Sequence, residues 1–166
     1  MPLTPYHWGP ASWIGLVFRK WLILPVFLIS AVIIDIEPGI VMFGGLNYPL
    51  HGFFHSFVGG TIAAIITALV FYSIRDLSSN AVQILGIKNK SFKIILLTSI
   101  LGVYSHIIFD SPLYTDIKPF YPLPINPFYK LFSYDQIYSF CKISFVVGII
   151  LFFIMYRKKG AGSFKR

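Results

Sequence analysis

All four histidines of this chain stand beside short polar interruptions of apolar sequence, at His7, His51, His55 and His106. Three of the six acidic residues lie in similar places, at Asp35, Glu37 and Asp110. Imidazole and carboxylate groups are costly to keep near a lipid bilayer unless they have partners. A bound metal ion would hold these groups together, so the residue types predict a metalloprotein.

The spacing of two clusters allows their side chains to share an ion. His51 and His55 are four residues apart. On a helix, both rings would project from one face with their bases about 5–6 Å apart, as in other histidine pairs that bind metals. His106 and Asp110 repeat this spacing with one nitrogen and one oxygen ligand.

The third cluster, Asp35 and Glu37, directly precedes Pro38-Gly39 and is predicted to form a turn in which both carboxylates face the ion. Glu37 is the candidate general base, and Asp35 is a candidate both for catalysis and for metal binding. Ligands are predicted at His7, Asp35, His51, His55, His106 and Asp110. No residue is assigned to substrate binding.

The composition indicates a membrane protein. Hydrophobic residues make up 56% of the 166-residue chain and charged residues only 12%, about half the share of soluble domains. Apolar stretches occur at 21–34, 57–72, 94–109 and 143–156. We expect an all-α, polytopic membrane helical bundle with about four spans, forming one integral-membrane domain over 1–166 in the cell membrane. The first 18 residues carry no basic n-region, so no signal peptide is expected.

The single cysteine, Cys141, excludes an intrachain disulfide and a multi-cysteine zinc site, so any metal must be held by nitrogen and oxygen ligands. Such ligands favour zinc and also accept manganese, nickel or iron. The net charge of +8 would fit nucleic acid as a partner. The basic residues cluster between the apolar stretches, however, which favours a membrane surface.

The basic groups also predict the topology. With spans at 21–36, 52–74, 92–111 and 137–156, the positive-inside rule places 35–51 and 115–136 outside and a basic tail, 157–166, in the cytoplasm. All three polar clusters then reach the same face. His7 joins them if an N-terminal helical hairpin turns at Arg19-Lys20, with arms of about 14 residues. The alternative, one helix over 11–36, leaves His7 at the opposite face.

Two further segments have recognisable patterns. Five prolines between 112 and 129 exclude a regular helix and predict an aromatic loop. This loop either caps the site or admits a lipid, or it is a plain connecting loop. Gly60, Ala64 and Ala68 recur every four residues and predict close helix packing.

These motifs together resemble the YdjM-like family of membrane-bound metal-dependent hydrolases. The resemblance covers about residues 1–125, which carry all the site motifs, and rests on His7, Asp35, Glu37, Pro38, His51, His55, Ser56, His106, Asp110 and Pro119-Phe120-Tyr121-Pro122. The family is similar to zinc-dependent phospholipases C, which implies hydrolysis of a phosphoester at a membrane. One departure is Gly52, which follows His51 directly where the family has an arginine.

The expected function is therefore a membrane-bound metal-dependent hydrolase that acts on a phosphoester or lipid-linked substrate through a metal-activated water. Its expected partners are the lipid bilayer and this substrate. The alternative is a metal-ion carrier or sensor without hydrolytic activity. A haem anchor is disfavoured because carboxylates accompany the histidine clusters.

Overall fold

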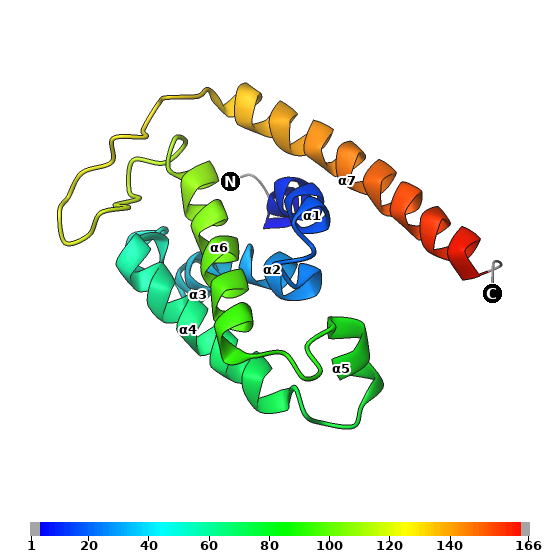
Figure 1. The fold of residues 1–166 in the computed structure, drawn as a ribbon. Helices are drawn as coiled ribbons and strands as arrows, with labels where there is room; N and C mark the ends of the chain where they lie inside the picture. Colours follow the sequence, from blue (N-terminus) through cyan, green and yellow to red (C-terminus); the bar gives the residue numbers. More distant parts are fainter. Residues whose placement is uncertain (1–3, 164–166) are drawn as a thin grey trace.

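A computed structural model describes the backbone of residues 4–163 and the side chains of residues 5–155. Within that part the chain is helical and contains no strand (Figure 1). Its elements are η1 (Thr4–His7), α1 (Trp8–Val17), α2 (Leu24–Ser30), η2 (Ile33–Asp35), α3 (Ile36–Gly44), η3 (Phe53–His55), α4 (Phe57–Ile74), α5 (Asn80–Leu85), α6 (Phe92–Asp110) and α7 (Tyr134–Ser163). The predicted all-α class is confirmed.

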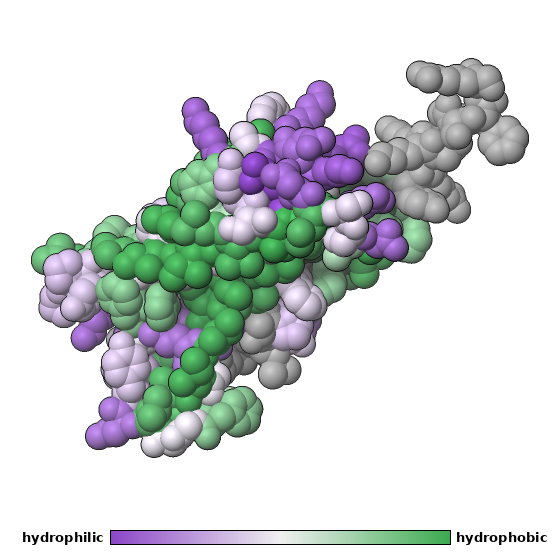
Figure 2. All heavy atoms as spheres, turned by 90° about the horizontal axis from the view of Figure 1, so that it is seen from below, coloured by the Kyte–Doolittle hydropathy of each residue, from purple (hydrophilic) through white to green (hydrophobic). Residues whose placement is uncertain are grey.

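Four helical stretches in the described chain are long and apolar enough to cross a membrane: Leu24–Gly44, Phe57–Ile74, Phe92–Asp110 and Tyr134–Met155. Large apolar side chains are exposed along α4, α6 and α7. Figure 2 shows a broad hydrophobic surface across one face, with hydrophilic side chains gathered toward its edges. Such a surface suits contact with lipid. The α7 backbone continues into the predicted basic tail, whose side chains lie outside the described residues.

The predicted N-terminal hairpin is present, but its helical arms are shorter than the expected 14 residues, since α1 has 10 residues and α2 has 7. A turn over Phe18–Trp21 joins α1 to α2, and the Trp21 N–H donates to the Phe18 carbonyl at 2.8 Å. Arg19 and Lys20 are exposed at this turn, where their charges reach water. The hairpin brings the N-terminal segment back toward the end of α6 (Figure 1).

The predicted span over 21–36 overlaps the membrane-length stretch Leu24–Gly44, which ends later than expected and is not one continuous α-helix. The helix ends at Ser30, and a second helix, α3, begins at Ile36. The carbonyl of Ala31 accepts a hydrogen bond from the His106 ring at 2.7 Å, and the Asp35 N–H donates instead to Val32 at 3.1 Å. A tertiary contact thus takes the acceptor that a continuous helix would use. Glu37 consequently lies in the first turn of a helix and not in a loop.

The second predicted span, 52–74, begins later than expected. The chain bends at His51, η3 covers Phe53–His55, and α4 starts only at Phe57. The Ser56 hydroxyl caps α4 by accepting from the Gly59 N–H at 3.0 Å. His51 and His55 therefore do not share an α-helix, which corrects the predicted geometry of this pair.

Small residues allow the helices to approach closely. Ala64 and Ala68 are fully buried, and a Cβ at Gly60 would lie 2.7 Å from Ile107, so the predicted small-residue stripe packs α4 against α6. On the other side of the molecule α1 packs against α7, where a Cβ at Gly9 would collide with the Cys141 carbonyl. The predicted loop over 112–129 contains no helix and is attached to α4 by the Phe57 N–H, which donates to Pro119 at 2.8 Å.

Candidate metal centre

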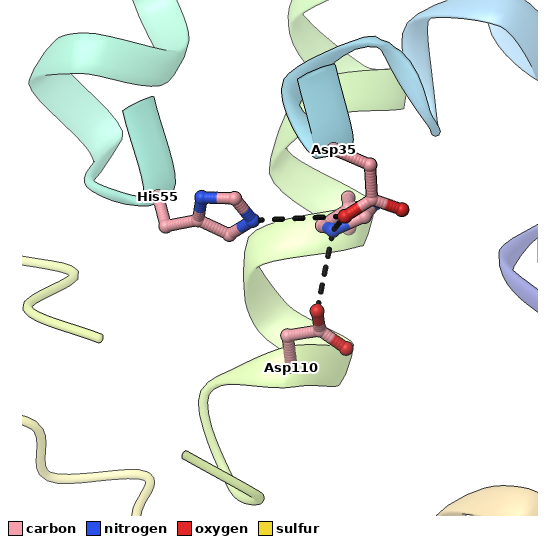
Figure 3. A group of neighbouring side chains, drawn as sticks. Asp35, His55 and Asp110 are labelled. Atoms are coloured by element: carbon pink, nitrogen blue, oxygen red, sulfur yellow. Dashed lines mark ion pairs between the residues drawn. The ribbon is translucent and has the colours of Figure 1, made fainter. Parts of the chain in front are cut away.

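Four of the six predicted ligands meet at one point. Asp35 ends η2, His55 ends η3, and His106 and Asp110 lie in the last turns of α6. One ligand atom from each residue lies within 4.8 Å of those from the others. Figure 3 shows Asp35, His55 and Asp110 converging from these three elements. We call these four residues the ligand cluster; they form a group that could hold a metal ion.

The distances within the ligand cluster fit a shared ion. His106 Nε2 lies 3.2 Å from Asp35 Oδ1 and 3.3 Å from Asp110 Oδ2, and His55 Nε2 lies 3.9 Å from Asp35 Oδ1. Ligand atoms about 2.1 Å from a tetrahedral zinc would lie about 3.4 Å from one another. Neither Nε2 makes a well-directed hydrogen bond among the described residues despite these short distances. The Nε2 atoms and the carboxylate oxygens therefore surround a common point, and they are not aligned as the donors and acceptors of hydrogen bonds.

Hydrogen bonds fix the orientation of the histidine rings. Nδ1 of His106 donates to the Ala31 carbonyl at 2.7 Å, and Nδ1 of His55 donates to Glu37 Oε2 at 2.9 Å. A carbonyl or carboxylate oxygen can only accept, so Nδ1 must carry the proton in both rings. The lone pair of each neutral ring then lies on Nε2, the atom aimed into the ligand cluster. Metal-binding histidines are ordinarily held in this way.

Burial makes these groups expensive without an ion. His55 and His106 are fully buried, and Asp110 is 3% exposed. Buried nitrogen and oxygen atoms without hydrogen bonds cost folding free energy and are rare in proteins. A divalent cation would accept lone pairs from both rings and balance the two carboxylates. On donor chemistry and spacing, the residues present fit a metal ion.

His7 lies beside the ligand cluster. Its ring stacks on that of His106 with 3.9 Å between centroids, and its Nε2 lies 3.3 Å from Asp110 Oδ1. The hairpin thus brings His7 to the site, as expected, although its carboxylate partner is Asp110 and not Asp35. His7 is not among the four residues whose ligand atoms meet.

His51 also flanks the ligand cluster. Its ring lies 4.8 Å from that of His55, in an edge-on arrangement, and 4.2 Å from the ring of Tyr114. Burial and the neighbouring His55 lower the pKa of His51 from its ordinary value. Its buried Nε2 makes no hydrogen bond within the described chain.

Asp116 holds His51 in place, although it is not among the site residues predicted from the sequence. The His51 backbone N–H donates to Asp116 Oδ2 at 2.9 Å, and His51 Nδ1 donates to Asp116 Oδ1 at 3.1 Å. Burial raises the pKa of Asp116, but these bonds outweigh it and lower the pKa overall. The only signal for Asp116 in the sequence was that acidic residues are rare in this apolar chain and that this one lies six positions after Asp110.

Glu37 supports His55 from outside the ligand cluster. Besides the His55 ring, its carboxylate accepts from the N–H groups of Gly52 and Phe54, at 3.1 and 3.2 Å. Burial would lower the pKa of His55, but the neighbouring carboxylates of Asp35 and Glu37 raise it overall. Both oxygens of Glu37 are engaged, which favours a positioning role for this residue over the predicted role as general base.

The chain matches no family model, and no curated protein or solved structure is significantly similar to it. The site must therefore be interpreted from its own geometry. Fold and site together define a helical protein, apolar enough to span a membrane, with a buried group of two histidines and two aspartates that could bind a metal ion.

Proposed function

We propose that this protein is a membrane-bound metal-dependent hydrolase that acts on a phosphoester or lipid-linked substrate. One observation carries the proposal: two buried histidines, each fixed through Nδ1, direct Nε2 toward two carboxylates on separate elements. The resemblance to the YdjM-like family adds the expectation of hydrolysis. Zinc is the proposed metal, because the ligands are nitrogen and oxygen at spacings near those of a tetrahedral site.

In this proposal Asp35, His55, His106 and Asp110 hold the ion. A divalent metal at such a site activates water and polarises the bond to be broken. Glu37 keeps the His55 ring aligned, and the Ala31 carbonyl does the same for His106. These contacts keep the ligands in place while a substrate enters.

His51 is proposed to accept the proton of the attacking water. Its Nδ1 is held by Asp116, so the neutral ring presents a lone pair at Nε2. It borders a polar cavity of about 140 Å³, so a group in this cavity lies next to the ring. Burial and the neighbouring His55 lower the pKa of His51, which favours the neutral ring that a proton acceptor requires.

Elemental analysis combined with an activity assay tests the proposal. Detergent-purified wild type should contain about one equivalent of metal per chain, and His106→Ala should contain almost none. Asp76→Asn is the control, because Asp76 is an exposed acid paired with Arg75, far along the chain from the site. Wild type and control should hydrolyse at least one member of a panel of phosphomonoesters, phosphodiesters and phospholipids, detected as the alcohol and the phosphate or phosphomonoester formed, whereas His106→Ala should hydrolyse none. A metal-loaded wild type that hydrolyses none of them would contradict the hydrolase and favour a carrier or sensor.

A further inference from the structure

Two cavities of opposite character meet at Tyr48. The larger, of about 550 Å³, lies between α3 and α4 and is lined almost entirely by apolar side chains, with Glu37 as its one charged residue. We call it the apolar groove. The smaller is the polar cavity beside His51, which also contains Asp116 and Lys118. Tyr48 lines both.

The apolar groove is open toward the surface that would face lipid. Ile36 and Ile40 on α3, and Ile66 and Val70 on α4, line it and are each more than half exposed. Both helices belong to stretches apolar enough to cross a membrane. The volume falls within the range of about 300–1,000 Å³ typical of ligand sites. Within a bilayer, the molecules available to fill such a groove are lipid chains.

The groove leads to the candidate metal centre. Glu37, at its polar end, holds the His55 ring at 2.9 Å, and Phe54, another lining residue, donates its N–H to Glu37. Gly52 permits this arrangement, because a Cβ there would collide with the Tyr48 ring and lie 2.7 Å from Glu37 Oε1. Only one residue layer therefore separates the groove from the ligand cluster.

The polar cavity has the chemistry of a headgroup site. Lys118 is one of only two cations in the segment 115–136, and its ammonium can pair with a phosphate. Tyr121 lines the same cavity and offers a hydroxyl. His51, on its inner side, lies next to His55 of the ligand cluster.

We propose that the apolar groove binds an acyl chain of an anionic glycerophospholipid, with the lipid phosphate in the polar cavity against Lys118. This inference rests on the proposed function and names its substrate class. The lipid would enter sideways from the bilayer between α3 and α4, with Tyr48 packed where its chain meets its headgroup. The phosphoester would then lie beside His51 and the ligand cluster.

Photocrosslinking tests this inference without relying on hydrolysis. Full-length protein in phosphatidylcholine nanodiscs receives a small fraction of phosphatidic acid carrying a diazirine on one acyl chain, and labelled peptides are mapped by mass spectrometry. Labels should concentrate on residues 33–48 and 63–71. Even labelling of all lipid-facing helices would overturn the inference, as would crosslinks between two copies of the chain at the groove.

Two neighbouring isoleucines on α4 supply a matched pair of variants. Ile66 lines the groove, whereas Ile65 is also exposed but lies outside it. Ile66→Trp should reduce labelling at the groove about fivefold or more by occupying its volume, and Ile65→Trp should leave it unchanged. Equal labelling of the two variants would contradict a chain in the groove.

Lys118→Gln tests the headgroup. It should weaken labelling by phosphatidic acid about fivefold, as expected for one cation near a lipid phosphate, and should not alter labelling by diacylglycerol with the same chains. An equal loss for both lipids would contradict a phosphate at Lys118. Asp35→Asn, which lacks a cluster ligand, should label like wild type. This readout therefore stands even if the metal-dependent hydrolysis fails.

Discussion

The two ends of the α4–α6 pair differ sharply in what holds them together. Near Ile74 and Phe92, the pair closes on a wholly apolar cluster that includes Ile23, Val26, Ala68, Phe71, Val82, Ile87 and Ile95. At the other end, His55 and His106 are buried among carboxylates. The apolar end is held mainly by the packing of side chains, whereas the polar end buries nitrogen and oxygen atoms that could bind a metal ion. A single helix pair can therefore carry an apolar core at one end and a buried polar cluster at the other.

Removing the metal should cause the largest loss of stability, through the loss of the metal's contacts at the polar end. An ion present at a thousandfold excess over its Kd stabilises the folded protein by about 4 kcal/mol. Chelation of wild type should therefore lower the melting temperature in detergent, and added zinc should restore it. Asp110→Asn should melt at the same temperature with and without chelator. A chelator response that persists in this variant would place the metal elsewhere.

Shortening a side chain at the apolar end should destabilise the protein without changing its metal content. Ile95 is fully buried in the apolar cluster. Ile95→Ala should cost about 2–4 kcal/mol of unfolding free energy through lost contacts and an unfilled cavity. Elemental analysis should find as much metal as in wild type. A loss of metal in Ile95→Ala would show that the metal site depends on packing at the apolar end, and that the two ends are not independent.

Glu37→Gln should weaken metal binding without abolishing it. The carboxylate fixes His55 through Nδ1, and loss of such a supporting contact typically costs about 10–100-fold in metal affinity. Competition with a chromophoric chelator measures this change. Asp76→Asn serves as control, since it removes an exposed carboxylate that does not touch the site. An unchanged affinity in Glu37→Gln would show that the ring needs no such support.

The smallest expected effect is a pH dependence confined to the polar end. The pKa of His55 is raised, so without metal this ring binds a proton more tightly than an ordinary histidine does. The metal must displace that proton, so its affinity should fall as the pH falls through the raised pKa and level off above it. Glu37→Gln should move this dependence to lower pH, because it removes a group that raises the pKa. Calorimetry in buffers of different ionisation enthalpy measures the protons released.

Several features of the site could be predicted from single segments. The helical class, the hairpin turn at Arg19-Lys20 and the small-residue contact of α4 with α6 follow from local hydropathy and residue size. The break between α2 and α3 could not be predicted this way. It depends on the Ala31 carbonyl being taken by His106, which lies 75 residues later in the chain.

The residues able to bind a metal could be named from the sequence, because in so apolar a chain each histidine and carboxylate needs a partner. Four membrane-length stretches also followed from the sequence, since length and hydropathy are properties of contiguous residues, but Asp35 lies within the stretch Leu24–Gly44 and not at its end. The tertiary structure alone decided that Asp35, His55, His106 and Asp110 meet, while His7 and His51 flank them. The physical reason is that ring orientation is set by hydrogen bonds from distant segments, such as that of Asp116 with His51 across 65 residues.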